Sequence, residues 1–128
     1  MKTRGALLLG VVGALCLLVG CSPLTIITSD QNGGTVTLEP SGILIVQLQG
    51  NLSTGYAWQI KDTLRPQVLK SLGQPKLDCD ETEMVGTPCS VEFQFRAVSP
   101  GTTPLELVYK RSWEDEPIDT FSVIVSVE

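Results

Sequence analysis

The sequence predicts an all-β fold, and three features of residues 35–128 support this prediction. Apolar and polar residues alternate with a period of two, which is typical of strands that bury one face. Turn-forming residues separate these runs at the intervals expected for short strands. No stretch has the spacing of apolar residues that an amphipathic helix needs. About seven strands of this kind favour an immunoglobulin-like antiparallel β-sandwich, with a small barrel as the alternative.

The individual strands follow from this alternation. Residues 91–97, 105–110 and 121–127 alternate along their length, which predicts three half-buried strands. Residues 56–61 alternate in the same way, and a short opening strand is expected at residues 35–38. The stretch 43–48 is more continuously apolar and predicts a central strand buried on both faces. Turns are expected at residues 40–42, 51–55 and 100–101 and at Pro117.

Length, composition and charge restrict the classes of function. The chain has 128 residues, enough for one domain with its own core. It contains no histidine, so the commonest general base and metal ligand are missing. The four cysteines, at positions 16, 21, 79 and 89, lack the spacing of a zinc site. A net charge of −5 opposes binding to nucleic acid. We therefore expect no metal, no cofactor and no nucleic-acid partner.

Candidate catalytic groups are also few. Carboxylates gather in residues 78–83 and 114–116, where solvated charge in polar turns is the simpler interpretation. The spacing with a central glycine that a calcium loop requires is absent. Ser53 and Ser112 have no histidine that would activate a hydroxyl. The sequence thus predicts that the protein is not an enzyme.

Residues 1–20 are predicted to be a lipoprotein signal peptide. Lys2 and Arg4 precede an unbroken run of apolar and glycine residues at 6–19, which is too short for a comfortable membrane span. The run ends in Leu18-Val19-Gly20-Cys21, which resembles the lipobox of bacterial lipoproteins. We expect cleavage before Cys21 and acylation of its thiol, palmitate included, which would anchor the protein stably through several chains.

The same interpretation predicts where the protein lies and where its folded part begins. By resemblance to enterobacterial lipoproteins, Ser22 after the cysteine favours the outer membrane, facing the periplasm or the cell surface. Residues 21–34 are interpreted as the lipidated cysteine and a tether, because they lack a sustained apolar pattern. The domain would then cover residues 35–128. Loss of the signal leaves 7 basic and 14 acidic residues, a net charge of −7.

Cys79 and Cys89 are expected to form a disulfide. The envelope is an oxidising compartment, in which two cysteines this close in sequence favour a structural bridge. Thiol catalysis is disfavoured because no histidine is present to activate a thiolate. Such a bridge stabilises by about 3 kcal/mol in the chain-entropy model. It would hold the base of an acidic loop at residues 80–88, and two unpaired thiols are the alternative.

Three segments between the predicted strands have the composition of binding loops. Residues 51–55 favour turns and allow close approach to the backbone. Residues 84–87 form an apolar tip within the cysteine-bounded loop. Residues 111–113 place an arginine and a tryptophan, which are enriched at binding hot spots, in a turn. Alternate loops of a sandwich emerge at the same end, so the three segments are expected to form one surface.

These segments are similar to the binding loops of the chagasin-type inhibitors of papain-like cysteine proteases. The first loop of that family has a pattern close to Asn-Pro-Thr-Thr-Gly-Tyr/Phe, followed one residue later by Trp. Here this stretch is Asn51-Leu52-Ser53-Thr54-Gly55-Tyr56-Ala57-Trp58. The family's last loop carries Arg-Pro-Trp, here Arg111-Ser112-Trp113. Its middle loop is glycine-rich, and Gly86 in Met84-Val85-Gly86-Thr87 is the best match. The resemblance covers roughly residues 35–128.

The resemblance implies a reversible, tight-binding inhibitor whose three loops block the protease cleft without being cleaved. Thr54 and Gly55 would lie nearest the catalytic cysteine of the protease, and Arg111 with Trp113 would lie on the primed side. Gly86 and its neighbours would take the non-primed side, while Tyr56 and Trp58 anchor the first loop. The implied protease-binding residues are Asn51, Leu52, Ser53, Thr54, Gly55, Tyr56, Val85, Gly86, Thr87, Arg111, Ser112 and Trp113. The protein is expected to act as a monomer.

Two positions depart from the family pattern, and a second function is possible. Leu52 and Ser112 stand where the family often has proline. Each lost proline removes about 0.4–1 kcal/mol of loop preorganisation, so the two together lower the expected affinity by up to about tenfold. The alternative function is an envelope lipoprotein that uses the same loops, on an immunoglobulin-like fold, for adhesion or binding to another partner.

Overall fold

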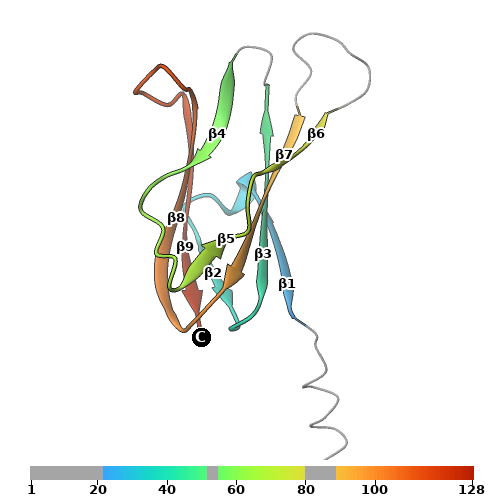
Figure 1. Ribbon diagram of the computed structural model, residues 1–128, viewed down its shortest axis with the longest axis vertical. Helices are drawn as coiled ribbons and strands as arrows, with labels where there is room; N and C mark the ends of the chain where they lie inside the picture. Colours follow the sequence, from blue (N-terminus) through green and yellow to red (C-terminus); the bar gives the residue numbers. More distant parts are fainter. Residues whose placement is uncertain (1–21, 52–54, 80–88) are drawn as a thin grey trace, which may run out of the picture.

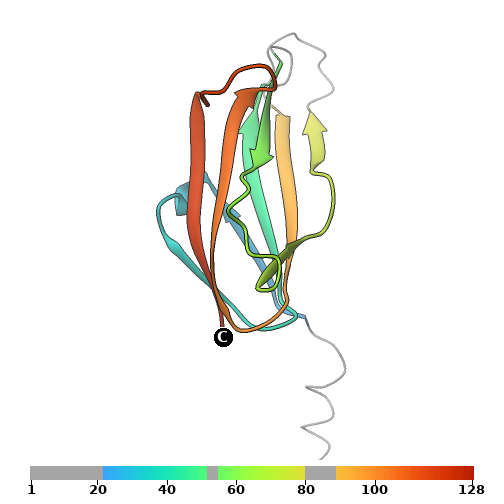
Figure 2. The same cartoon turned by 60° about the vertical axis from the view of Figure 1, so that its left-hand side comes forward.

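The computed structural model describes residues 22–51, 55–79 and 89–128, which form a sandwich of two β-sheets (Figures 1 and 2). One sheet has the order β1-β3-β7-β5, with β6 also paired to β7, and the other has the order β2-β9-β8-β4. The strands are β1 (Leu24–Thr28), β2 (Thr35–Leu38), β3 (Ile43–Gly50), β4 (Tyr56–Ile60), β5 (Leu69–Ser71), β6 (Lys76–Cys79), β7 (Cys89–Ala97), β8 (Gly101–Arg111) and β9 (Asp119–Val127). The all-β prediction is confirmed.

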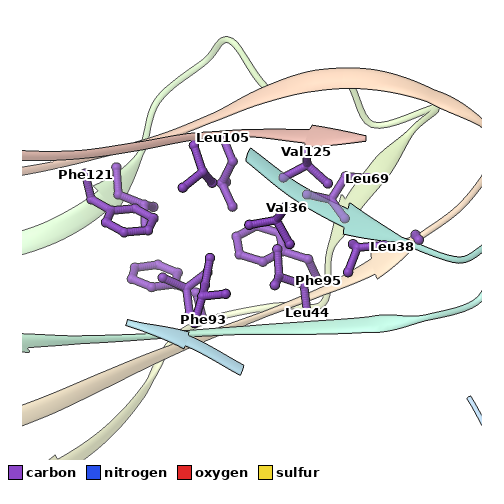
Figure 3. Packing of buried hydrophobic residues seen from close by; sticks show 14 of the residues in the cluster. Val36, Leu38, Leu44, Leu69, Phe93, Phe95, Leu105, Phe121 and Val125 are labelled. Carbon is purple, nitrogen blue, oxygen red and sulfur yellow. The ribbon is translucent and has the colours of Figure 1, made fainter. Parts of the chain in front are cut away.

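The two sheets are held together by apolar side chains that alternate along the strands. Phe93 and Phe95 of β7 point from one sheet toward Leu105 of β8 and Phe121 of β9 in the other (Figure 3). Each of these side chains is buried because its strand exposes only the opposite face. The whole buried cluster comes from residues 27–127. A chain that begins at residue 22 therefore contains the complete described sandwich.

The prediction that residues 21–34 are a tether is wrong for residues 24–31, which form a strand and a short helix. Residues Leu24–Thr28 form β1, which pairs in parallel with β3 and buries Ile27 against the core. A short 3-10 helix, η1 (Ser29–Gln31), follows and is capped at Thr28. No helix among the described residues is long and apolar enough to cross a membrane. The folded part therefore starts near Leu24, where pairing with β3 begins. The β-branched residues of this segment suit an edge strand.

Two further details differ from the predictions. The sheets are mixed, because β1–β3 and β2–β9 are parallel pairs beside the antiparallel ones, and the described residues contain nine strands instead of about seven. The central strand β3 is not buried on both faces. Leu44 and Val46 are buried, while Ile43 and Ile45 are only half-buried, since none of the described residues forms a further layer over the outer face of this sheet.

The sandwich has two distinct ends. At the loop end, β3, β6 and β8 finish and β4, β7 and β9 begin (Figure 1). At the opposite end, which we call the terminal end, β1 begins and β9 reaches the C-terminus (Figures 1 and 2). The predicted positions 1–21, 52–54 and 80–88 lie outside the described residues, including Cys21, Leu52, Ser53, Thr54, Val85, Gly86 and Thr87.

Candidate functional site

The strand ends that lead into the three predicted loops are neighbours at the loop end. Gly50, the last residue of β3, pairs with Cys89, the first residue of β7. Cys89 also pairs with Cys79 at the end of β6. In the other sheet, Tyr56 at the start of β4 pairs with Arg111 at the end of β8. The prediction that the three loops begin from one end of the sandwich is confirmed for these described residues.

Tyr109 connects the two sheets where the first loop starts. Its hydroxyl accepts a hydrogen bond from the backbone N–H of Asn51 at 2.8 Å and donates to the backbone carbonyl of Asn51 at 3.0 Å. One side chain of β8 thus satisfies both backbone groups of the residue that follows β3. Gly50 lies beside the Tyr109 and Trp58 rings, and a Cβ there would be at ordinary van der Waals distance, 3.4 Å from Tyr109 and 3.5 Å from Trp58. Tyr109 therefore fixes the departure point of the first loop.

A row of aromatic rings runs from the core toward the surface of the loop end. The Trp58 and Tyr109 ring centroids are 5.1 Å apart, and the Tyr109 and Tyr56 centroids are 5.4 Å apart. Trp58 is only 7 % exposed, and its indole Nε1 donates to the Gln49 carbonyl at 2.9 Å. Buried aromatic rings with a satisfied polar atom make rigid supports. The predicted anchoring role of Tyr56 and Trp58 agrees with these contacts.

Arg111 extends this row to the outermost aromatic side chain. Its guanidinium carbon lies 4.5 Å from the centre of the Tyr56 ring and 5.8 Å from that of Trp113. It also forms an ion pair with Glu114 at 3.3 Å. The backbone N–H of Glu114 donates to the Arg111 carbonyl at 3.1 Å, which closes the turn. The guanidinium is thus within cation–π distance of both rings, and this contact helps to hold Trp113, whose side chain is 71 % exposed.

Gly55 brings the end of the first loop against the tryptophan of the last loop. Its backbone φ is +85°, a left-handed conformation that glycine adopts without strain. A Cβ added at Gly55 would lie 2.9 Å from the Trp113 ring atom Cη2, and 3.8 Å from Cγ of Arg111. No side chain larger than hydrogen fits in this position without moving the tryptophan. Two motifs that lie far apart in the sequence therefore form one surface.

The base of the middle loop is closed by a disulfide. Cys79 and Cys89 are bonded, as predicted, and their Cα atoms are 4.2 Å apart. Cys89 is buried beside Gly50, so the bridge joins the base of the middle loop to the start of the first loop. Val85, Gly86 and Thr87 themselves lie outside the described residues.

The chemistry available at this end is recognition through shape and aromatic area. Among residues 22–51, 55–79 and 89–128, no group of three or more His, Cys, Asp or Glu side chains could hold a metal ion. Ser112 is exposed between Arg111 and Trp113.

Sequence reasoning missed Tyr109 as a site residue, because its role depends on a contact with Asn51, 58 positions away. An arginine and a tryptophan held rigidly at an exposed turn are typical of a binding hot spot.

Comparisons with known proteins agree with this geometry. The family model described as "Chagasin family peptidase inhibitor I42" matches residues 37–125, which include both motif-bearing segments. Amoebiasin-2 of Entamoeba histolytica is 34% identical over 106 residues, covering 78% of this chain and 84% of that protein. Chagasin of Trypanosoma cruzi is 25% identical over 89 residues, covering 68% of this chain and 81% of chagasin. A crystal structure of a cysteine protease inhibitor from Entamoeba histolytica matches with a TM-score of 0.72 and 30% identity, covering 83% of this chain and 96% of that chain.

Proposed function

Because this chain belongs to the chagasin family of peptidase inhibitors, we propose that it inhibits papain-like cysteine proteases by placing its loop end in the active-site cleft. Members of this family are inhibitors and not enzymes, which agrees with the absence of histidine from the chain. One observation carries the proposed mode of binding. Trp113 is 71 % exposed and is nevertheless fixed against Gly55 and Arg111, at the end where all three loops begin.

The geometry explains how this end would occupy a narrow cleft. Gly55 has no side chain, so the backbone of the first loop can approach a catalytic cysteine closely. Trp113 presents a flat ring that can lie against aromatic groups of the enzyme. Because its position is already set by Arg111, little side-chain entropy is lost on binding. Ties at Asn51 and at the disulfide keep the loops from relaxing, which favours a blocked cleft over cleavage.

The proposed contact set includes residues from all three loops. It comprises Asn51, Leu52, Ser53, Thr54, Gly55, Tyr56, Val85, Gly86, Thr87, Arg111, Ser112 and Trp113. Of these, Asn51 and Tyr56 are held from below by Tyr109, so they position the first loop more than they extend from it. The inhibitor is proposed to act as a monomer, because a single loop end supplies the whole set.

Inhibition assays test the proposal. The chain 22–128 is titrated against papain and cathepsin L, and the inhibitor is recovered afterwards for mass analysis. We expect reversible inhibition at one inhibitor per enzyme, with the recovered chain uncleaved. If the correctly folded chain inhibits neither enzyme, the alternative of an envelope binding or adhesion module becomes the better account.

Replacing Tyr109 with phenylalanine is expected to weaken inhibition of papain about five- to tenfold. The change removes the two hydrogen bonds between the Tyr109 hydroxyl and the backbone of Asn51. Each lost bond costs roughly 1 kcal/mol, part of which lowers stability and part of which loosens the first loop. Inhibition constants and urea unfolding separate the two parts. Unchanged inhibition by this variant would show that the first loop needs no fixed departure point.

Removing the disulfide by the double change Cys79→Ala and Cys89→Ala is expected to lower the free energy of unfolding by about 3 kcal/mol. Inhibition is expected to weaken several-fold, because the bridge restrains the middle loop and offsets the prolines missing at Leu52 and Ser112. The double variant removes the bridge without a reducing agent, so both chains are compared with activated papain after the reducing agent has been removed. An inhibition constant equal to that of the unmodified chain would contradict a role of the bridge in binding.

We also propose that the mature protein is lipid-anchored through Cys21, in the outer membrane and facing the periplasm or the cell surface. The basic start, the apolar run and the sequence Leu18-Val19-Gly20-Cys21 support this proposal. Metabolic labelling of the full chain with palmitate in a bacterial host tests it. Label is expected on the full chain and absent from the variant Cys21→Ser. Equal labelling of both would rule out Cys21 as the site.

A further inference from the structure

The outer face of the five-stranded sheet has an unusual composition near the terminal end. Register places Leu24, Ile43, Arg96 and Lys70 side by side across β1, β3, β7 and β5. The next row of side chains on the same outer face consists of Ile26, Ile45 and Gln94. We call the first row together with these two isoleucines the basal patch. It comprises Leu24, Ile26, Ile43, Ile45, Lys70 and Arg96.

The aliphatic part of the basal patch is exposed beyond what a solvated strand requires. Leu24 is 60 % exposed and Ile26 is 53 % exposed, and both stand on an edge strand. Ile43 and Ile45 lie beside them and are half-buried. Isolated apolar residues on a surface need no explanation, but four neighbouring aliphatic side chains form a patch that favours contact with another apolar phase.

The cationic part of the basal patch is equally unusual. Lys70 and Arg96 are direct cross-strand partners and both are exposed. Like charges in directly opposite positions destabilise a sheet. No acidic side chain among the described residues forms an ion pair with either of them. The nearest acidic residue along β7 on this face, Glu92, is hydrogen-bonded to Gln47 and Gln94. An anionic partner would relieve the repulsion between the two cations.

The basal patch lies close in sequence to Cys21, the proposed site of lipid attachment, which favours a membrane surface as its anionic partner. Leu24 follows Cys21 by three positions in the sequence. Three residues span at most about 10 Å when fully extended. Acyl chains on Cys21 would therefore hold this corner of the sandwich within about 10 Å of the bilayer surface, at a high local concentration of phospholipid headgroups.

We propose that the basal patch rests on an anionic membrane surface, with its aliphatic side chains at the interface and its two cations against phosphate-bearing headgroups. The proposal rests on the lipid anchor proposed above. Aliphatic side chains gain by leaving water, and each cation near an anionic leaflet adds attraction. The patch thereby converts a loose tether into a defined orientation of the domain.

This orientation presents the inhibitory loops to solution. β8 has eleven residues and rises roughly 35 Å from the terminal end to the loop end. The acidic residues Glu114, Asp115 and Glu116 lie in the segment after β8, at the far end from the patch. At that height they lie several Debye lengths, each about 8–10 Å, above the membrane, so headgroup charge repels them little. A protease in solution would then meet the loop end first.

Vesicle binding by the chain 22–128, which lacks the anchor, tests the patch directly. We expect weak binding to vesicles of phosphatidylcholine with phosphatidylglycerol, less binding to phosphatidylcholine alone, and a decrease with added salt. Lys70→Gln is expected to lower the partition coefficient about fivefold. Lys61→Gln, directly after the edge strand β4 of the other sheet, is expected to leave it unchanged. Ile26→Ser is expected to lower it several-fold, unlike Ile124→Ser. Equal effects of the matched variants, or equal binding to both vesicle types, would overturn the proposal.

Tethering measures the orientation itself. In a chain that starts at Cys21, Cys79 and Cys89 are bonded to each other, so Cys21 can be coupled alone to a maleimide lipid. Spin-labelled lipids are expected to quench the fluorescence of the tryptophan introduced by Ile26→Trp. They are expected not to quench that of the tryptophan introduced by Ile124→Trp, on the outer face of the other sheet. Equal quenching of both, quenching of neither, or a dimer that covers the patch in solution would overturn the proposal.

These outcomes are separate from those that test the anchor and the inhibitor. Chemical coupling replaces biological acylation, so the tethered experiment does not depend on whether cells modify Cys21. None of the substituted positions lies at the loop end. Inhibition of papain by the same variants therefore tests the inhibitory function separately from membrane binding. We expect that inhibition to stay at the level of the unmodified chain.

Discussion

Replacing Trp113 with alanine is expected to weaken inhibition of papain by about 30- to 1000-fold. Truncation of a hot-spot tryptophan costs roughly 2–4 kcal/mol of binding energy. Trp113 has the properties of such a residue, since it is 71 % exposed in the free protein and held by Arg111 and Gly55. Little of this loss is expected in the free energy of unfolding, because the side chain lies outside the buried cluster. Inhibition constants and urea unfolding measure the two quantities.

The matched control for Trp113 is Ile124→Ala. Ile124 is another exposed large apolar residue, 42 % exposed, but it lies on the outer face of β9 away from the loop end. Its truncation is expected to change inhibition by less than about twofold. The proposed surface is incorrect if Trp113→Ala inhibits as well as this control does.

Gly55→Ala is expected to weaken inhibition of papain by about 10- to 100-fold. The new Cβ would lie 2.9 Å from the Trp113 ring, so the ring or the end of the first loop must shift. The left-handed backbone at φ +85° adds strain of roughly 1–2 kcal/mol for any residue with a Cβ. Both effects disturb a contact between two loops that must enter the same cleft. The inhibition constant is the measurement.

Gly33→Ala separates displacement of the tryptophan from backbone strain. Gly33 has nearly the same conformation, with φ +84°, but a Cβ there would meet no atom within 4 Å. Both variants are expected to lose a similar amount of stability in urea unfolding. Only Gly55→Ala is expected to lose inhibition. Similar losses of inhibition in the two variants would show that the contact between Gly55 and Trp113 has no role in binding.

The strands that could be predicted are those whose burial leaves a clear mark in the sequence. Burial alternates along all nine residues of β7 and along residues 121–127 of β9, because one face of each strand packs on the other sheet there. β5 and β6 have only three and four residues, and β6 buries no side chain, so neither carries a readable pattern. The sequence of β1 indicates a tether and not a strand, because its five residues stand between Pro23 and a polar segment. Its parallel partner is not adjacent in sequence.

The sequence predicts which residues belong to the candidate site, but it does not predict the contacts that hold them together. Residues 51–58 and 111–113 carry motifs that resemble a known family, and the turn-forming and aromatic residues there indicate binding loops. The clamp between Tyr109 and Asn51 and the contact between Gly55 and Trp113 join residues 58 positions apart in each case. Such contacts depend on how two sheets pack and on which strands pair. One sequence does not contain that information in its local pattern.

Whether the loop end enters the cleft is measured by comparing the binding of the chain 22–128 to papain with an open cleft and to papain whose cleft is filled by a covalent peptidyl inhibitor. If the loop end enters the cleft, tight binding to the open enzyme is expected, together with a loss of at least about 100-fold on the filled enzyme. Titration calorimetry at one fixed temperature measures both affinities. Equal affinity for the open and the filled enzyme would show that the inhibitor binds outside the cleft.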